Sequence, residues 1–311
     1  MGSTGAGAGH GHAAGRAADR GRLRLVLLIT VTVLVVELVG ALLTGSLALL
    51  ADAGHMATDA TGVVIALSAA YVATRPATPR RTFGLHRAEI LAALVNAVVL
   101  LGVCTFLGYV GVRRLITPSE VEAGPMIAFA AVGLLANAVS LLVLQRSDSG
   151  SLNMRGAWLE VASDLVGSVL AVAAGVVIVL TGFHRADAIA SLLIAGLILP
   201  RSFSLLRESV SVLMESTPRG LDLAEVERHL AGVDGVTEVH DLHAWTITSG
   251  IPSLSAHVTV TDEALAARGV GVLLDELSVC VAGHFGVRHA TFQVEPVSHR
   301  RHEDLGEAGC E

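Results

Sequence analysis

Four ionisable side chains stand inside two apolar stretches of this 311-residue chain, in two pairs of identical spacing. His55 and Asp59 are four residues apart, and so are Glu160 and Asp164. On a helix, residues at this spacing share one face and lie about 6 Å apart along the axis. An imidazole and a carboxylate at this spacing form half of a divalent metal site. The two pairs together therefore predict a four-ligand metal site built from two helices.

The stretches that carry these pairs are long enough to cross a bilayer. Placing a charged group inside the bilayer costs free energy, so each such residue is expected to have a function and a partner that offsets its charge. The site would lie roughly 13 Å into its first helix, close to the middle of the bilayer. Six apolar runs fit transmembrane helices, namely 23–43, 46–73, 90–112, 125–144, 157–180 and 186–206.

The composition agrees with a multi-span membrane protein. The chain is 52% hydrophobic with only 4% aromatic residues, so small and aliphatic residues supply the apolar mass and suit close helix packing in lipid. The net charge of −7 gives no basic footprint for nucleic acid. Cys104, Cys280 and Cys310 form no CxxC pair, so neither a disulfide framework nor a thiolate zinc site is predicted.

The arginines indicate the orientation, because the chain contains no lysine. Arginine side chains precede the first run, lie between the second and third and between the fourth and fifth, and end the sixth. They share one side if both termini are cytoplasmic. Arg113 and Arg114 fall on the opposite side. The balance predicts a multi-pass protein of the plasma membrane with both termini inside; the supporting residues are Arg16, Arg20, Arg22, Arg24, Arg75, Arg80, Arg81, Arg87, Arg146, Arg155, Arg201 and Arg207.

Polar segments flank the apolar region, which we bound at 23–208. Residues 1–22 predict a disordered cytoplasmic arm, in which His10 and His12 either hold metal weakly or are incidental. Residues 209–296 predict a small soluble domain, and 297–311 a disordered tail. Within the domain, the patterns predict the order α-β-β-α-β, with an open sheet covered by helices on one face; the segments are 222–230, 236–247, 253–260, 263–285 and 289–294.

Three motifs resemble the cation diffusion facilitator family. Residues 46–56 (SLALLADAGHM) are similar to its second span, 82–91 (TFGLHRAEIL) to the entry into its third, and 239–245 (VHDLHAW) to the first strand of its cytoplasmic domain. The resemblance covers about 23–296 and is nearest to bacterial zinc, cobalt and cadmium efflux members. It implies a homodimeric, proton-coupled transporter that exports divalent metal. It also implies six transmembrane helices followed by a cytoplasmic α+β ferredoxin-like domain.

The resemblance implies a tetrahedral transport site at His55, Asp59, Glu160 and Asp164. Zinc members typically carry histidine where Glu160 stands. Zinc accepts carboxylate oxygen, so we expect Zn²⁺ as the transported ion, although three carboxylates move the preference toward Mn²⁺. Co²⁺ and Cd²⁺ are further alternatives. With all three carboxylates ionised the empty site would approach −3, so we expect at least one to be protonated before metal arrives. We hypothesise that Glu160 takes over part of the proton coupling.

Other polar residues have structural and functional interpretations that both stay open. Asp52 is predicted to support the site or the helix packing, since it points about 60° away from His55 on the helix. Glu37, Asn96 and Asn137 are expected to make hydrogen bonds between helices. The resemblance places three residues of the soluble domain at or near cytoplasmic zinc positions: His240, His257 and Glu295. The alternative is that they are surface or core residues that bind no metal.

Three other classes of protein are alternatives to a secondary transporter. A membrane-embedded metallohydrolase would need an open metal position and typically an HExxH or nucleophile motif, and the sequence contains none. A primary pump is disfavoured because no GxxxxGK[ST] loop is present. A metal sensor or scaffold that does not transport remains an alternative. The leading prediction is a secondary transporter, not an enzyme, with metal ions, protons, lipid and a second copy of the chain as partners and no nucleic acid.

Overall fold

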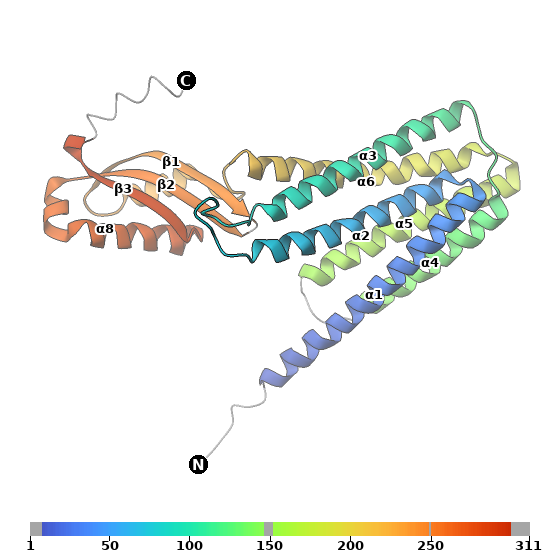
Figure 1. The fold of residues 1–311 in the computed structure, drawn as a ribbon, viewed down its shortest axis with the longest axis horizontal. Coiled ribbons are helices and arrows are strands. Elements are labelled where there is room, and N and C mark those ends of the chain that lie inside the picture. Colours follow the sequence, from blue (N-terminus) through green and yellow to red (C-terminus); the bar gives the residue numbers. More distant parts are fainter. Residues whose placement is uncertain (1–7, 146–151, 249, 300–311) are drawn as a thin grey trace, which may run out of the picture. The chain divides into compact units, whose positions relative to one another are not determined.

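The computed structural model describes residues 8–145, 152–248 and 250–299, without the side chains of 8–23 and 152–156. It divides into two compact units, Met1–Ile65 with Val95–Leu205 and Ala66–Leu94 with Leu206–Glu311. In the described part, six helices are long and apolar enough to cross a membrane, as predicted. They are α1 (Ala8–Thr44), α2 (Leu47–Ala73), α3 (Ala88–Ile116), α4 (Ala123–Gln145), α5 (Leu152–Thr181) and α6 (Arg185–Leu213) (Figure 1).

The helix α1 begins earlier than the sequence patterns predicted. It is helical from Ala8, so the prediction of a disordered arm at 1–22 is wrong for residues 8–22, while residues 1–7 lie outside the described part. Alanine and arginine, which are frequent here, are strong helix formers, and a helix that is already nucleated in the apolar run extends at little cost. The side chains of His10 and His12 lie outside the described residues.

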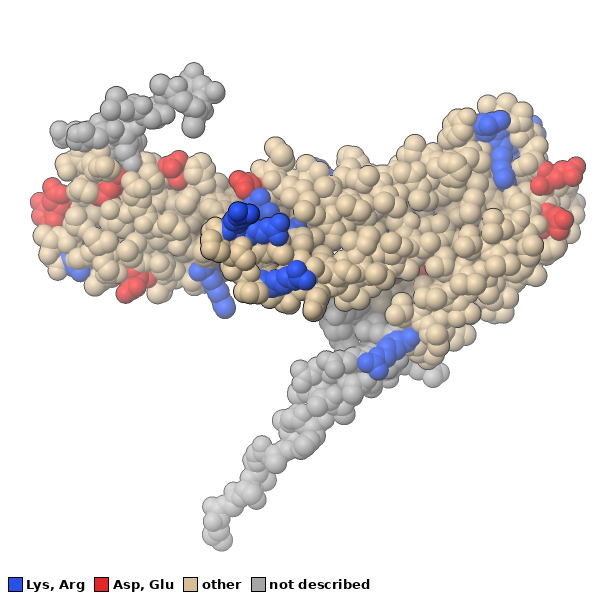
Figure 2. All heavy atoms as spheres, viewed as in Figure 1, with Lys and Arg blue, Asp and Glu red and all other residues tan. Residues whose placement is uncertain are grey.

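The helices of the first unit pack through small residues and present large apolar side chains outward. Ala48, Ala51, Ala130 and Ala171 are fully buried between helices. Outward-facing residues such as Leu180 are largely exposed. Figure 2 shows the visible helix surfaces almost free of charged side chains, which gather near the helix ends. An apolar exterior and a close-packed, small-residue interior are what a lipid environment requires.

The start of α2 is fixed by a carboxylate from another helix. Gly45 adopts the left-handed conformation (φ 70°) that ends α1, so α1 and α2 join in a tight hairpin. The buried Asp187 of α6 accepts hydrogen bonds from the Ser46 hydroxyl (2.6 Å) and from the backbone N–H groups of Leu47 (2.7 Å) and Ala48 (3.1 Å). Its charge is paired with Arg114 at 3.4 Å. Asp187 therefore satisfies N–H groups that a helix start leaves without partners.

The soluble domain has the predicted element order. The helix α7 (Leu223–Ala231) is followed by β1 (Val236–Thr248), β2 (Ile251–Val260), α8 (Asp262–Phe285) and β3 (His289–Pro296). The strand β2 pairs antiparallel with β1 and parallel with β3, and α8 provides the crossover that a parallel pair requires. Alternate β2 residues join both helices in one core, including Leu254, Val258 and Val260. The predicted disordered tail opens with a helical turn at 297–299, and 300–311 lie outside the described residues.

The cap on α2 makes a prediction about stability. Asp187→Ala leaves buried N–H donors and Arg114 without their acceptor, so we expect it to lower the free energy of unfolding by about 2 kcal/mol or more. Chemical unfolding of the full chain in detergent measures this. Glu120→Ala, which removes an exposed acid in the loop before α4, is the matched control and should change little. Equal stability of the two variants would contradict the capping role.

Candidate metal sites

The predicted transmembrane ligands come together between α2 and α5. The Nε2 atom of His55 lies 3.5 Å from Oδ2 of Asp59 and 3.8 Å from Oδ1 of Asp164. Glu160 interacts with Asp59 and His55 from the α5 side. His55 and Asp164 are buried, whereas Asp59 and Glu160 keep partial exposure. The two pairs at i, i+4 spacing therefore face one another within the first unit.

The two separations at His55 suit a shared cation better than a hydrogen bond, whereas Asp59 and Glu160 are hydrogen-bonded to each other. Ligand atoms at about 2.0–2.3 Å from a tetrahedral zinc ion lie about 3.5 Å from one another, close to the two distances at His55. A hydrogen bond would bring these atoms to about 2.9 Å. The Nδ1 atom of His55 is buried and has no hydrogen-bond partner among the described residues. The imidazole of His55 therefore lies at ligand-to-ligand distance from one carboxylate of α2 and one of α5.

Arg201 contributes a charge that the sequence interpretation missed, because it was read only as an orientation marker. It belongs to α6, next to Pro200, and its positive charge acts on His55, Asp59, Glu160 and Asp164. A guanidinium stays charged at all physiological pH values. It therefore offsets part of the negative charge of three neighbouring carboxyl groups. An arginine inside the sixth apolar helix, rather than beyond it, was the available signal.

A second buried polar network crosses the helices one turn away from the site. Asp52 accepts a hydrogen bond from the Ser168 hydroxyl (3.4 Å), which in turn accepts one from the amide of Asn137 (3.3 Å). Glu37 of α1 is fully buried and interacts with Asp52. The network joins α1, α2, α4 and α5. Asp52 thus lies beside the predicted ligands, in contact with residues that hold the helices together.

The soluble domain carries a tighter cluster at the predicted cytoplasmic positions. His240 and His257 are direct partners across β1 and β2, and Glu295 stands on the neighbouring β3. One Glu295 oxygen lies 3.3 Å from Nε2 of His240 and 3.7 Å from Nδ1 of His257. The Glu295 carboxylate is buried, and neither oxygen accepts a hydrogen bond from the part of the chain that is described. The donor atoms of the three residues all lie within 4.8 Å of one another, as in a metal-binding set.

Asp241 adds a carboxylate to the edge of this cluster. It has a left-handed backbone (φ 49°) at an irregularity in β1, between His240 and His243. Its Oδ2 atom lies 3.7 Å from Nε2 of His257. The hydrogen bond with His243 (2.8 Å), aided by the charges of the neighbouring imidazoles, lowers the pKa of Asp241 below its usual value. Asp241 is therefore anionic at neutral pH and available to a cation.

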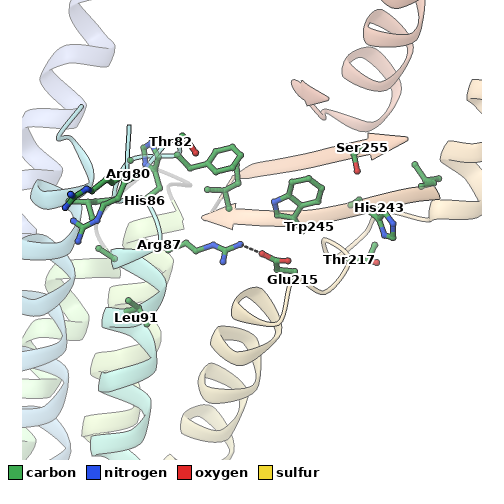
Figure 3. Close-up of a pocket in the computed structure, with 18 of the residues that line it drawn as sticks. Arg80, Thr82, His86, Arg87, Leu91, Glu215, Thr217, His243, Trp245 and Ser255 are labelled. Atoms are coloured by element: carbon green, nitrogen blue, oxygen red, sulfur yellow. Dashed lines mark hydrogen bonds and ion pairs between the residues drawn. The ribbon is translucent and has the colours of Figure 1, made fainter. Parts of the chain in front are cut away.

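The second unit also contains a cavity that is separate from both groups of predicted metal ligands. It encloses about 920 Å³ and is lined by residues of the α2–α3 connection, including Arg80, His86 and Arg87, and by soluble-domain residues that include Trp245 (Figure 3). Figure 3 shows Arg87 directed at Glu215, and their ion pair measures 2.7 Å. Both side chains are well exposed, so the pair contributes less than about 1 kcal/mol. The cavity contains none of the predicted metal ligands.

Six membrane-length helices, two of which hold a set of imidazole and carboxylate side chains between them, define a multi-pass membrane protein with groups that can bind a cation. Comparison with known proteins makes the class specific. Family models match at 23–214, described as the cation efflux transmembrane domain, and at 218–297, described as the cation efflux protein cytoplasmic domain. The chain belongs to this cation efflux, or cation diffusion facilitator, family. Its members are transporters and not enzymes, so divalent metal cation efflux is the function of the class.

Relatives match along most of their length. The metal cation efflux system protein CzcD of Cupriavidus metallidurans is 44% identical over 84% of this chain and 82% of its own. The zinc transporter ZitB of Escherichia coli is 40% identical over 84% and 83%. The cadmium, cobalt and zinc/H(+)-K(+) antiporter of Bacillus subtilis is 36% identical over 86% of each chain. A solved structure, the metal-bound C-terminal domain of CzcD, is 40% identical over 24% of this chain and 99% of its own, with a TM-score of 0.22.

The contact between α2 and α5 can be tested through a glycine. A methyl group at Gly167 would lie 2.7 Å from Oδ1 of Asp52, which Ser168 holds in place. We therefore expect Gly167→Ala to destabilise the full chain by roughly 1–3 kcal/mol and to reduce transport. Gly102→Ala on α3 is the matched control, since nothing lies within 4 Å of its added methyl group. Thermal unfolding in detergent compares the two, and equal midpoints would show that this helix contact is not tight.

Proposed function

We propose that this protein exchanges Zn²⁺ for protons and exports the metal from the cytoplasm. The observation that carries the proposal is the position of the His55 imidazole, whose Nε2 atom lies 3.5 Å from an oxygen of Asp59 and 3.8 Å from an oxygen of Asp164, the separations of neighbouring ligands around a tetrahedral ion. Glu160 completes the set. We place the membrane domain at 23–208 and the cytoplasmic domain at 209–296, with α6 extending across the boundary to Leu213.

Competition between metal and protons explains the exchange. Metal binds deprotonated ligands, so loading releases protons and protonation expels metal. We assign one exchanged proton to the imidazole of His55 and the remaining exchange to a carboxyl group of the set. Arg201 keeps the empty site from accumulating the full charge of three carboxylates. Rocking of helices around a fixed central site would open it to each side of the membrane in turn.

Zinc is the ion that the combined observations favour. A relative described as a zinc transporter is 40% identical to this chain, and one described as a cadmium, cobalt and zinc antiporter is 36% identical. Carboxylate oxygen binds zinc at about the same distance as imidazole nitrogen, so Glu160 is compatible with a zinc site. Three carboxylates with one imidazole also suit Mn²⁺, which prefers oxygen ligands. Manganese preference is therefore the second candidate, and a membrane metal sensor without transport is the third.

We infer that both termini face the cytoplasm. Six spans place the chain before α1 and the soluble domain after α6 on the same side of the membrane. Most arginines flank the helix ends of that side, and the positive-inside rule assigns it to the cytoplasm. Three arginines lie at the opposite helix ends, and two of them make structural contacts there. Arg114 donates to the Gly45 carbonyl (2.7 Å), and Arg185 donates to the Leu115 carbonyl (2.7 Å). Because these two hold helix connections, they weigh little against the proposed orientation.

The cytoplasmic cluster is proposed as an additional metal site of the transporter. His240, His257 and Glu295 supply three donors, and the anionic Asp241 is close enough to join them. The cytoplasmic domain is the one that dimerises in this family, and the family match at 218–297 supports a homodimer. We propose that metal bound here favours packing of two copies when cytoplasmic zinc is abundant.

Removal of one transmembrane ligand should abolish transport. In proteoliposomes we expect Asp59→Asn to reduce zinc-driven proton flux by about 100-fold or more. Removing a residue that only hydrogen-bonds to a metal ligand already lowers metal affinity or activity by roughly 10–100-fold, and removing a ligand should cost more. Glu122→Gln, which neutralises an exposed acid outside the helix interior, is the control and should retain flux. Absence of flux from the unmodified protein with every metal tested would favour the sensor. Undiminished flux in Asp59→Asn would disprove the site.

Substitution of Glu160 should change metal selectivity. Glu160→His restores a second imidazole, so we expect the ratio of zinc to manganese flux to rise and the pH dependence to shift. Glu160→Gln, which keeps an oxygen but removes the charge, separates the effect of the imidazole from the loss of a carboxylate. Flux assays over a range of pH with zinc, cobalt, cadmium and manganese give the comparison. An unchanged metal order and pH profile in Glu160→His would refute the role proposed for Glu160.

A further inference from the structure

A third group of metal-ligating side chains lies on the helices of the soluble domain, apart from both sites described above. His229 comes from the last turn of α7, and Cys280 and His284 come from the last turns of α8. Their donor atoms all lie within 4.8 Å of one another. The rings of His229 and His284 are 4.8 Å apart between centroids. The cluster shares no residue with the His240–His257–Glu295 set.

The positions follow from helix periodicity on two packed helices. Cys280 and His284 are four residues apart and share one face of α8, as Glu225 and His229 share one face of α7. A surface cavity of about 410 Å³ is lined by Glu225, His229 and His284, among other residues. An ion from the solvent can therefore reach the two imidazoles, and Glu225 is placed to supply a fourth ligand or to hold a water molecule that does so.

The hydrogen bonding of His284 prepares it for a metal. Its Nδ1 atom lies 3.0 Å from the backbone carbonyl oxygen of Cys280. A carbonyl oxygen can only accept, so Nδ1 carries the proton and Nε2 offers a lone pair. Metal-binding histidines commonly donate their second ring N–H to a carbonyl or carboxylate in this way, which fixes the orientation of the ring.

Cys280 gives the cluster its chemical preference. Burial raises the pKa of its thiol, so the residue is neutral until a metal ion displaces the proton into solvent. One sulfur and two imidazole nitrogens form a borderline-soft donor set, which suits Zn²⁺, Co²⁺ and Cd²⁺ and disfavours Mn²⁺, Mg²⁺ and Ca²⁺. Neither of the other two sites contains a sulfur ligand.

We propose that His229, Cys280 and His284 bind one thiophilic divalent ion that links α7 to α8, with Glu225 or water as the fourth ligand. The bound ion closes a long segment of chain, since β1 and β2 lie between the two helices in sequence. Metal binding of this kind adds directly to the stability of the fold. Cytoplasmic zinc would thereby stiffen the helical face of the domain, whatever the transport activity of the membrane helices.

Cobalt spectroscopy of the full chain in detergent tests the proposal. A thiolate bound to Co²⁺ gives an intense near-ultraviolet charge-transfer band, which sites with only nitrogen and oxygen ligands lack. We expect this band in the unmodified protein, its loss in Cys280→Ser, and its weakening in His229→Gln. Cys310→Ser and Cys104→Ser should keep it. His257→Ala should also keep it, because the band does not arise from the strand cluster.

A matched substitution guards against simple unfolding. Val279→Ser changes the residue next to Cys280 on α8, where the valine is largely exposed. It should keep both the cobalt band and the rise in thermal midpoint that zinc produces, whereas Cys280→Ser should keep the midpoint without metal and lose part of the rise. Absence of the band in the unmodified protein, or its persistence in Cys280→Ser, would overturn the proposal. Neither result depends on transport, so failure here is distinguishable from failure of the proposed exchange.

Discussion

The cost of placing charge inside an apolar helix bundle is the constraint on which this structure depends. Three carboxyl groups and an imidazole lie between α2 and α5, where the carboxyl groups disfavour one another's negative charge and the positive charge of Arg201 offsets part of it. A divalent cation completes such a set better than any protein group can. The same constraint explains why the ligands are partly exposed at Asp59 and Glu160. A substrate ion must enter the site and leave it.

The rest of the membrane unit holds these groups at the correct depth. Asp187 fixes the first turn of α2, and His55 follows two turns later on the same helix. The network from Glu37 through Asp52 and Ser168 to Asn137 joins the helices that carry the ligands to those that do not. Small residues allow the close approach. Buried polar groups in this protein are therefore concentrated where helix position matters for the site.

The sequence predicted the features that depend on local pattern. Hydropathy and length located six helices, because a spanning helix has no other means of satisfying its backbone in lipid. The i, i+4 pairs predicted side chains that face one another between α2 and α5, and alternation in β2 predicted the soluble core. The helical start of α1 was missed because polar, glycine-containing composition predicted disorder, although alanine and arginine, which favour helices, are frequent there.

Features that depend on distant contacts were not predictable. The Asp187 cap joins residues about 140 positions apart, and the Asp241 irregularity of β1 arises from strand pairing. A thiolate-containing metal site was not predicted from the sequence because no CxxC motif is present, so the cluster on α7 and α8 was missed. Its ligands come from two helices that meet only after folding. A local motif search finds ligand pairs on one element, and a site shared between elements requires the fold.

The central claim is that zinc displaces protons from the transmembrane ligands. Calorimetric zinc titration of the full chain in two buffers of different ionisation enthalpy measures the protons released per ion bound. His257→Ala and Cys280→Ser together weaken the cytoplasmic ligand sets, so that the transmembrane site dominates. The account predicts release of about one proton or more per zinc ion, and loss of this binding when Asp59→Asn is added. Zinc binding without proton release, or binding that Asp59→Asn leaves unchanged, would contradict it.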